Sequence, residues 1–156
     1  MSRLRYLLDT DVLCKKDGPN GRNIVKWLRT VDDDTLAIGA LTIFEISKGV
    51  EKKRSSGPSD VAAALEAGLV GIKSAFAGRI IAVDAEVAEE WGRLVGPTPK
   101  DWFDRGLVAT AKSSGLVLVT CNAKDMKGLG VEVINPERDP PGRWERDGTP
   151  IKAPTP

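Results

Sequence analysis

Short apolar runs alternate with longer stretches of helical spacing along most of the chain. The runs have the length and aliphatic content of buried strands, and they cover residues 6–8, 35–40, 79–83, 116–120 and 131–134. Apolar residues three and four positions apart predict the helices between them, near 21–30, from 41 to a break at 55–58, from there to 76, and over 85–94 and 103–111. Because strands and helices alternate, we expect an α/β fold in which helices cover both faces of a central parallel sheet of about five strands.

The regular pattern stops after Pro136, so we expect one domain over residues 1–136. The remaining residues, 137–156, contain half of the prolines of the chain, several arginines and few apolar side chains. Such a segment cannot bury enough surface to fold alone. It is interpreted either as a flexible tail or as a segment that docks on this domain, on a second protomer or on RNA, with Trp144 as the anchor.

Acidic residues fall where the predicted strands end and the following helices begin. Asp9 follows the first strand and Asp125 the fourth, while Glu45 and Asp104 lie in predicted helices. The carboxyl ends of parallel strands meet at one edge of a sheet, so these four carboxylates are expected to share a crevice. Crowded carboxylates stay ionised only with a cation, and oxygen ligands select a hard ion. The pattern therefore predicts a Mg²⁺ site, with Mn²⁺ as a possible substitute, that suits phosphodiester hydrolysis.

Each acidic residue also has a purely structural interpretation. Asp9 is placed to cap a helix that begins near Thr10. The segments 42–45 and 98–101 fit capping boxes, in which Glu45 and Asp101 fold back onto backbone amides. Asn122 and Asp125 are spaced to cap a short helix. The sequence leaves open whether Asp11 or Asp101 joins the site.

The composition narrows the chemistry. The chain contains no histidine, which excludes Ser-His-Asp hydrolysis, histidine-assisted ribonuclease chemistry and histidine-ligated zinc. Its two cysteines, Cys14 and Cys121, are far apart and lack metal-ligand spacing. The net charge of +1 gives no overall attraction for nucleic acid. Charged residues interrupt the first apolar run and no apolar stretch is long enough for a membrane span, so we expect a cytoplasmic protein with no membrane partner.

Four segments together resemble the ordered motifs of PIN-domain proteins, and most closely those of VapC-type toxins of bacterial type II toxin-antitoxin systems. The segments are 6–11 (YLLDTD), 44–50 with Phe44-Glu45, 104–111 with Asp104, and 118–125 (LVTCNAKD). The resemblance covers residues 5 to 136. Asp11, Cys121 and Met126 depart from the residues common in that family, which are Asn, Arg and Phe.

The resemblance implies a PIN-like three-layer sandwich and a Mg²⁺-dependent endoribonuclease that cuts single-stranded or looped RNA. It also implies a homodimer and an antitoxin that inserts a segment beside the active site. By the same resemblance, the metal-binding and catalytic quartet is Asp9, Glu45, Asp104 and Asp125. The residues that support the site or contact the substrate are then Thr10, Thr120 and Asn122.

Two other functions are compatible with parts of the pattern. Asp9-Thr10-Asp11 after a strand resembles the opening motif of haloacid-dehalogenase-type phosphatases, in which the first Asp is a nucleophile. That interpretation leaves Glu45 and Asp104 without a role. A non-catalytic domain could instead receive an arginine of a partner protein in its acidic cleft. For a nucleic-acid partner, a basic rim is predicted from Lys15, Lys16, Arg22, Lys48, Lys100, Arg105 and Lys124.

Overall fold

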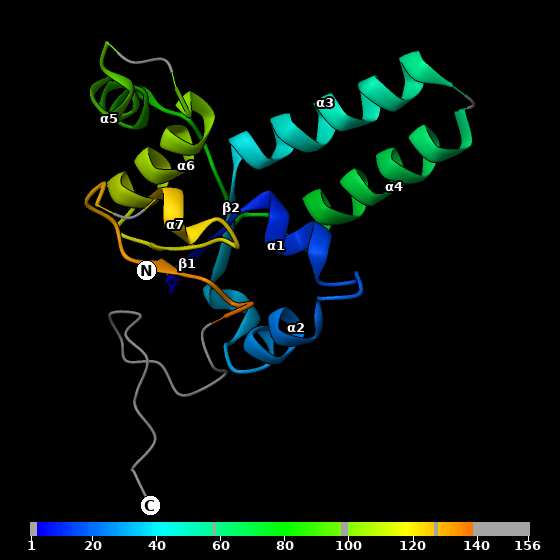
Figure 1. Ribbon diagram of the computed structural model, residues 1–156, viewed down its shortest axis with the longest axis horizontal. Helices are drawn as coiled ribbons and strands as arrows, with labels where there is room; N and C mark the ends of the chain where they lie inside the picture. The colour runs from blue at the N-terminus through cyan, green and yellow to red at the C-terminus, as the bar shows by residue number, and fades with distance from the viewer. Residues whose placement is uncertain (1–2, 58, 98–99, 127, 139–156) are drawn as a thin grey trace, which may run out of the picture.

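The protein contains a five-stranded sheet in which every pair of neighbouring strands is parallel. The structure is a computed structural model that describes residues 3–57, 59–97, 100–126 and 128–138 (Figure 1). The strand order is β3-β2-β1-β4-β5. The strands are β1 (Tyr6–Leu8), β2 (Leu36–Gly39), β3 (Ile80–Ile81), β4 (Val117–Val119) and β5 (Val133–Ile134). The predicted α/β architecture is thus confirmed, and each strand lies within its predicted range.

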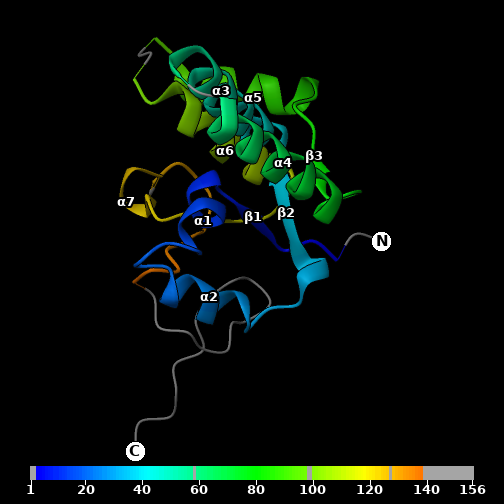
Figure 2. The same cartoon turned by 90° about the vertical axis from the view of Figure 1, so that its right-hand side faces the viewer.

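Helices cover both faces of this sheet, which gives three layers (Figure 2). One face carries α1 (Thr10–Lys15) and α2 (Arg22–Leu28), and the other carries α5 (Ala85–Val95), α6 (Trp102–Ser113) and the short α7 (Ala123–Met126). A long hairpin of α3 (Ala40–Ser56) and α4 (Ser59–Ala75) extends away from the sheet (Figure 1). A single 3₁₀ turn, Asp33–Thr35, precedes β2. Within the described ranges, no helix combines the length and the apolar character needed to cross a membrane.

Successive side chains of the strands point to opposite faces of the sheet, where they form two separate hydrophobic cores. Tyr6 and Leu8 point to the face covered by α2, where the ring of Tyr6 meets that of Trp27 edge-on at 5.2 Å between centroids. Leu7 points to the opposite face and packs with Leu107 and Leu118. Each fully buried side chain of this size contributes roughly 1.5–3 kcal/mol to the free energy of unfolding. The central strands are therefore held from both sides, and their carboxyl ends are fixed in place.

Both predicted capping boxes are wrong. Helix α3 begins at Ala40 because β2 ends at Gly39, so Glu45 lies beyond the first turn and is not placed to fold back on the helix start. Helix α6 begins at Trp102, and Asp101 is its N-cap residue in a left-handed conformation (φ 56°), without a side-chain capping bond. Residues 98 and 99, where the second box was expected to start, lie outside the described residues.

The apolar stripe predicted for α4 is buried only near the base of the hairpin. Ile72 and Phe76 pack against the core on the side of α1 and α2. Val61 and Leu65, nearer the tip, are 54% and 40% exposed, because the hairpin leaves the sheet and α4 packs mainly on α3. Helical spacing identified the stripe correctly, but it carries no information about how far the helix extends beyond the core.

Gly106 on α6 is a point of close approach to α3 and α5. A Cβ atom there would lie 2.6 Å from Leu41 Cδ1 and 2.7 Å from Trp91 Cε2. We expect Gly106→Ala to lower the free energy of unfolding by roughly 1–3 kcal/mol, since a packed interface must shift to admit the methyl group. Equilibrium urea denaturation measures this change.

Gly68→Ala is the matched control. Gly68 lies inside α4, and a Cβ atom added there would meet nothing within 4 Å, so alanine should stabilise the protein by about 0.5–1 kcal/mol. Equal effects of the two substitutions would show that helix propensity, and not the approach of Leu41 and Trp91, determines the response at Gly106.

Candidate active site

The site lies where the strand order reverses, at the carboxyl ends of β1 and β4. From β1 the chain proceeds outward through β2 and β3 on one side, and through β4 and β5 on the other. Open parallel sheets bind ligands at such a switch point, because the loops that leave the two central strands diverge there. Asp9 is the residue directly after β1, and Thr120 is the residue directly after β4.

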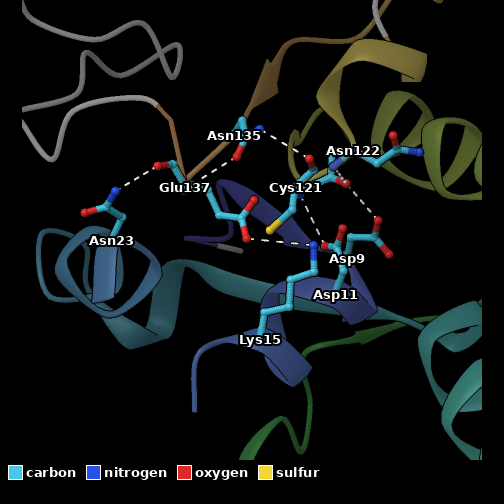
Figure 3. A network of polar contacts seen from close by, with 9 residues as sticks. Asp9, Asp11, Lys15, Asn23, Cys121, Asn122, Asn135 and Glu137 are labelled. Atoms are coloured by element: carbon cyan, nitrogen blue, oxygen red, sulfur yellow. Dashed lines mark hydrogen bonds and ion pairs between the residues drawn. The ribbon is translucent and has the colours of Figure 1, made fainter. Parts of the chain in front are cut away.

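Asp9 is held by two hydrogen bonds that use both of its carboxylate oxygens, and Figure 3 shows its position beside Asn122. Its Oδ1 accepts a bond from the Thr10 backbone N–H (2.6 Å), and its Oδ2 accepts one from the Thr120 hydroxyl (2.8 Å). Thr120 Oγ1 in turn accepts a bond from the Asn122 backbone N–H (3.0 Å). Asp9 is therefore the N-cap of α1, as its structural interpretation predicts, and it also lies beside Thr120 at the carboxyl edge of the sheet.

Burial makes the ionised form of the Asp9 carboxylate unfavourable in free energy. The residue is only 6% exposed, and its pKa is raised from 3.8 to about 7, with burial as the largest cause. The nearby Asp11 carboxylate contributes to this rise, and Glu45 contributes a smaller part of it. The hydrogen bonds from Thr120 and Thr10 act in the opposite direction, because they stabilise the ionised form.

Asp104 brings the remaining predicted carboxylates into the same cluster. It is partly buried in the first turn of α6, and this burial raises its pKa. The charges of Asp101, Glu45, Asp125 and Asp11 raise it further, in that order of strength. Glu45 acts on both Asp9 and Asp104 and so links the two halves of the cluster. Asp125, on α7, is exposed and forms the outer edge.

Asp11 belongs to this cluster, and a second hydrogen-bonded chain reaches it from β5 (Figure 3). Asp11 Oδ1 accepts a bond from the Cys121 backbone N–H (3.3 Å), and the Cys121 carbonyl accepts one from Asn135 Nδ2 (3.2 Å). Asn135 Oδ1 accepts the backbone N–H of Glu137 (3.0 Å). Sequence reasoning missed Asn135, although its position directly after a predicted strand places it at the same edge of the sheet as Asp9.

Glu137 closes this chain against α1 and α2. Its carboxylate lies 3.8 Å from Lys15 Nζ, and its carbonyl accepts a bond from Asn23 Nδ2 (2.8 Å). Glu137 is the first residue of the predicted tail, and it packs on the domain beside the crevice. The predicted anchor Trp144 and the rest of residues 139–156 lie outside the described part of the chain.

The donor atoms of the cluster suit a divalent cation. The cluster offers carboxylate oxygens from Glu45, Asp104, Asp125, Asp9 and Asp11. Burial is the largest cause of the raised pKa of Asp9 and Asp104, and repulsion from neighbouring carboxylates adds to it. Among the described residues, however, no group of three acidic or cysteine side chains is arranged to hold an ion between them. Ligation would therefore require the carboxylates to rotate toward one another. The residues fit the chemistry of a hard cation.

The predicted basic rim is only partly available for phosphate. Arg105 is wrongly placed in it, because its guanidinium turns inward and donates to the carbonyl of Leu94. Lys15 and Lys16 pair with Glu137 and Asp17. Arg22, Lys48, Lys100 and Lys124 are exposed on the surface.

The fold and the site define a class of protein, a parallel α/β domain with a cluster of carboxylates at its switch point. Residues 6–129 match the PIN domain family, and the chain belongs to this family. The resemblance noted in the sequence is thereby confirmed.

Known proteins similar to this chain are nucleases and toxin-antitoxin components. The tRNA(fMet)-specific endonuclease VapC of Shigella flexneri is 28% identical over 132 residues, which cover 81% of this chain and 93% of that protein. The structure of FitAB bound to an IR36 DNA fragment superposes with a TM-score of 0.72 at 26% identity, covering 85% of this chain and 96% of the other. A toxin-antitoxin complex from Klebsiella pneumoniae superposes with a TM-score of 0.59, also at 26% identity, covering 84% and 97%.

The raised pKa of Asp9 predicts a pH-dependent stability. The folded chain keeps a proton on Asp9 at pH values where the unfolded chain, with a pKa of 3.8, has lost it. The free energy of unfolding in EDTA should therefore fall as the pH rises from 3.8 to about 7. We expect Asp9→Asn to recover on the order of 2–4 kcal/mol of this loss, less the cost of one donor left without its acceptor.

Urea denaturation of both proteins across this pH range, in EDTA, measures the difference. Asp60→Asn, which removes one exposed carboxylate on α4, is the control and should keep the wild-type profile. If Asp9→Asn and wild type lose stability in parallel with rising pH, Asp9 is not the buried group that titrates.

Proposed function

We propose that this PIN-domain chain is the endoribonuclease toxin of a toxin-antitoxin module, of the VapC type. The observation that carries the proposal is the buried Asp9 at the switch point. Glu45 raises the pKa of Asp9, and it also raises the pKa of Asp104. The family assignment and the VapC endonuclease relative support the activity. The proposed substrate is single-stranded or looped RNA, which presents a phosphodiester to an open acidic crevice.

The proposed cofactor is Mg²⁺, with Mn²⁺ as a substitute. Asp9 and Asp104 would hold it, with Glu45 and Asp125 completing the acidic set. When bound, the cation lowers the pKa of its water and neutralises charge that develops on phosphate oxygens. The Thr120 hydroxyl fixes the orientation of Asp9, and the Thr10 backbone N–H holds the second oxygen, so the carboxylate meets the substrate in one orientation.

The neighbouring carboxylates supply the remaining chemistry of the chain. Because Asp9 and Asp104 would hold the cation, the carboxylates left to accept a proton from the attacking water are those of Glu45 and Asp125.

An antitoxin protein and a second copy of this chain are the proposed partners. The Klebsiella structure at 26% identity is a toxin-antitoxin complex, which supports the first. An antitoxin side chain that entered the acidic crevice would exclude RNA and so act as the off switch. The phosphatase interpretation of Asp9 and Asp11 gives way to the family assignment, which accounts for Glu45 and Asp104 as well.

The purified chain, free of antitoxin, should cleave a mixed structured RNA into discrete products in Mg²⁺ or Mn²⁺ and not in EDTA. Asp9→Asn and Asp104→Asn should each lower the rate by at least roughly 100-fold, because each removes a charge that acts on the reacting phosphate. Gel analysis of end-labelled RNA measures the rate.

Asp60→Asn, on the exposed side of α4, serves as the control and should cleave like wild type. Metal-dependent cleavage that survives both site substitutions would place the nuclease activity elsewhere or in a contaminant. Failure to cleave any RNA, with the metal bound, would favour the non-catalytic domain that receives a partner's arginine.

A further inference from the structure

Half of the aromatic residues of the chain gather at the start of α6. The rings of Trp91 and Trp102 stack with their centroids 5.6 Å apart and their planes at 11°. Trp102 meets Phe103 edge-on at 5.9 Å, and Phe103 lies 6.0 Å from Phe44 on α3. Trp102 and Phe44 are nevertheless 49% and 50% exposed. Large aromatic rings so exposed are unusual unless the surface has a binding role.

This aromatic row runs directly beside the carboxylates of the candidate active site. Phe44 immediately precedes Glu45 on α3, and Phe103 immediately precedes Asp104 on α6. The two phenyl rings contact each other across the helices, while the two carboxylates interact electrostatically. On both α3 and α6 the aromatic residue and the carboxylate are therefore consecutive positions, which point about 100° apart around the helix axis.

The aromatic row is held rigidly from behind. Trp91 Nε1 donates a hydrogen bond to the carbonyl of Trp102 (2.6 Å). Gly106 lets the Trp91 ring approach α6 so closely that a Cβ atom would overlap it. The stacked pair thus keeps its orientation without a ligand, which lowers the entropic cost of stacking a further ring on it.

The charges around the row favour nucleic acid over a second copy of the chain. The Lys48 ammonium lies 6.0 Å from the centre of the Phe44 ring, where it can meet a phosphate between two stacked bases. A second copy seated symmetrically on the same rings would bring its Glu45 and Asp104 toward those of the first, whereas RNA phosphates would meet these carboxylates through the cation of the proposed function.

We propose that Phe44 and Trp102 form a base-stacking subsite for single-stranded nucleic acid, adjoining the acidic crevice. This proposal rests on the proposed nuclease function for the choice of ligand. A phosphodiester at Asp104 and Glu45 has its flanking bases within reach of rings carried by the preceding residues. Stacking tolerates any base and requires unpaired bases, so the subsite selects single strands over duplexes.

The test is binding of a short, fluorescent, mixed-sequence single-stranded RNA, measured by anisotropy with Mg²⁺ in an Asp9→Asn background. Phe44→Leu and Trp102→Leu, added singly to that background, should each weaken binding by roughly 5- to 100-fold. Val70→Ala, which trims an exposed apolar side chain on α4, is the matched control and should leave affinity unchanged. An abasic oligomer with the same number of phosphates should bind all four proteins alike.

Equal affinity of the aromatic variants and the Asp9→Asn parent for single-stranded RNA would overturn the subsite. So would an equal loss of affinity for the abasic oligomer, since the rings would then act through the phosphates or the fold. If Trp102→Leu changes the association state in sedimentation while each protomer binds RNA as before, the row is a protein interface. Because cleavage is not the readout, a chain that proves unable to cut RNA can still confirm the subsite, and an active nuclease can refute it.

Discussion

The carboxylate of Asp9 is buried at the point where the sheet reverses its strand order. Burying a carboxylate costs free energy, and the groups around Asp9 are those needed to offset this cost. A buried carboxylate persists only with hydrogen bonds or a counter-charge. The Thr10 N–H at the start of α1 and the Thr120 hydroxyl at the end of β4 supply the bonds. The pairing of β1 with β4 brings Thr120 to Asp9, so a main-chain constraint determines a side-chain contact.

Two hydrogen bonds do not offset this cost fully, because further carboxylates stand nearby. Asp11 and Glu45 both raise the pKa of Asp9, and four acidic neighbours raise the pKa of Asp104. A domain selected for stability alone would replace some of these groups, since each buried like charge lowers the free energy of unfolding. Their retention is understandable if a cation offsets the repulsion when the site is occupied, at the expense of the metal-free fold.

Local patterning predicted the sheet but not the helix starts or the links between distant segments. Apolar runs located all five strands, and the end of the first located Asp9, whereas Thr120 was predicted only from the family resemblance. The box at 42–45 failed because a capping motif spans only four residues, whereas α3 begins where β2 ends, at Gly39. The bond from Asn23 to Glu137 joins positions 114 residues apart, and no local pattern contains such a contact. The side chains that surround the site were thus predictable as positions along the chain, while their partners required the folded topology.

The links from Asn135 and Glu137 matter most because β5 is short and lies at the edge of the sheet. A strand of two residues paired on one side offers few main-chain bonds to hold the carboxyl edge in register. Asn135 compensates by donating a hydrogen bond to the Cys121 carbonyl, and the backbone N–H of Cys121 donates one to Asp11. The position of Asp11 therefore depends on a side-chain bridge between two loops as well as on its helix. In this domain the central strands place Asp9, and hydrogen bonds from beyond the edge strand hold Asp11.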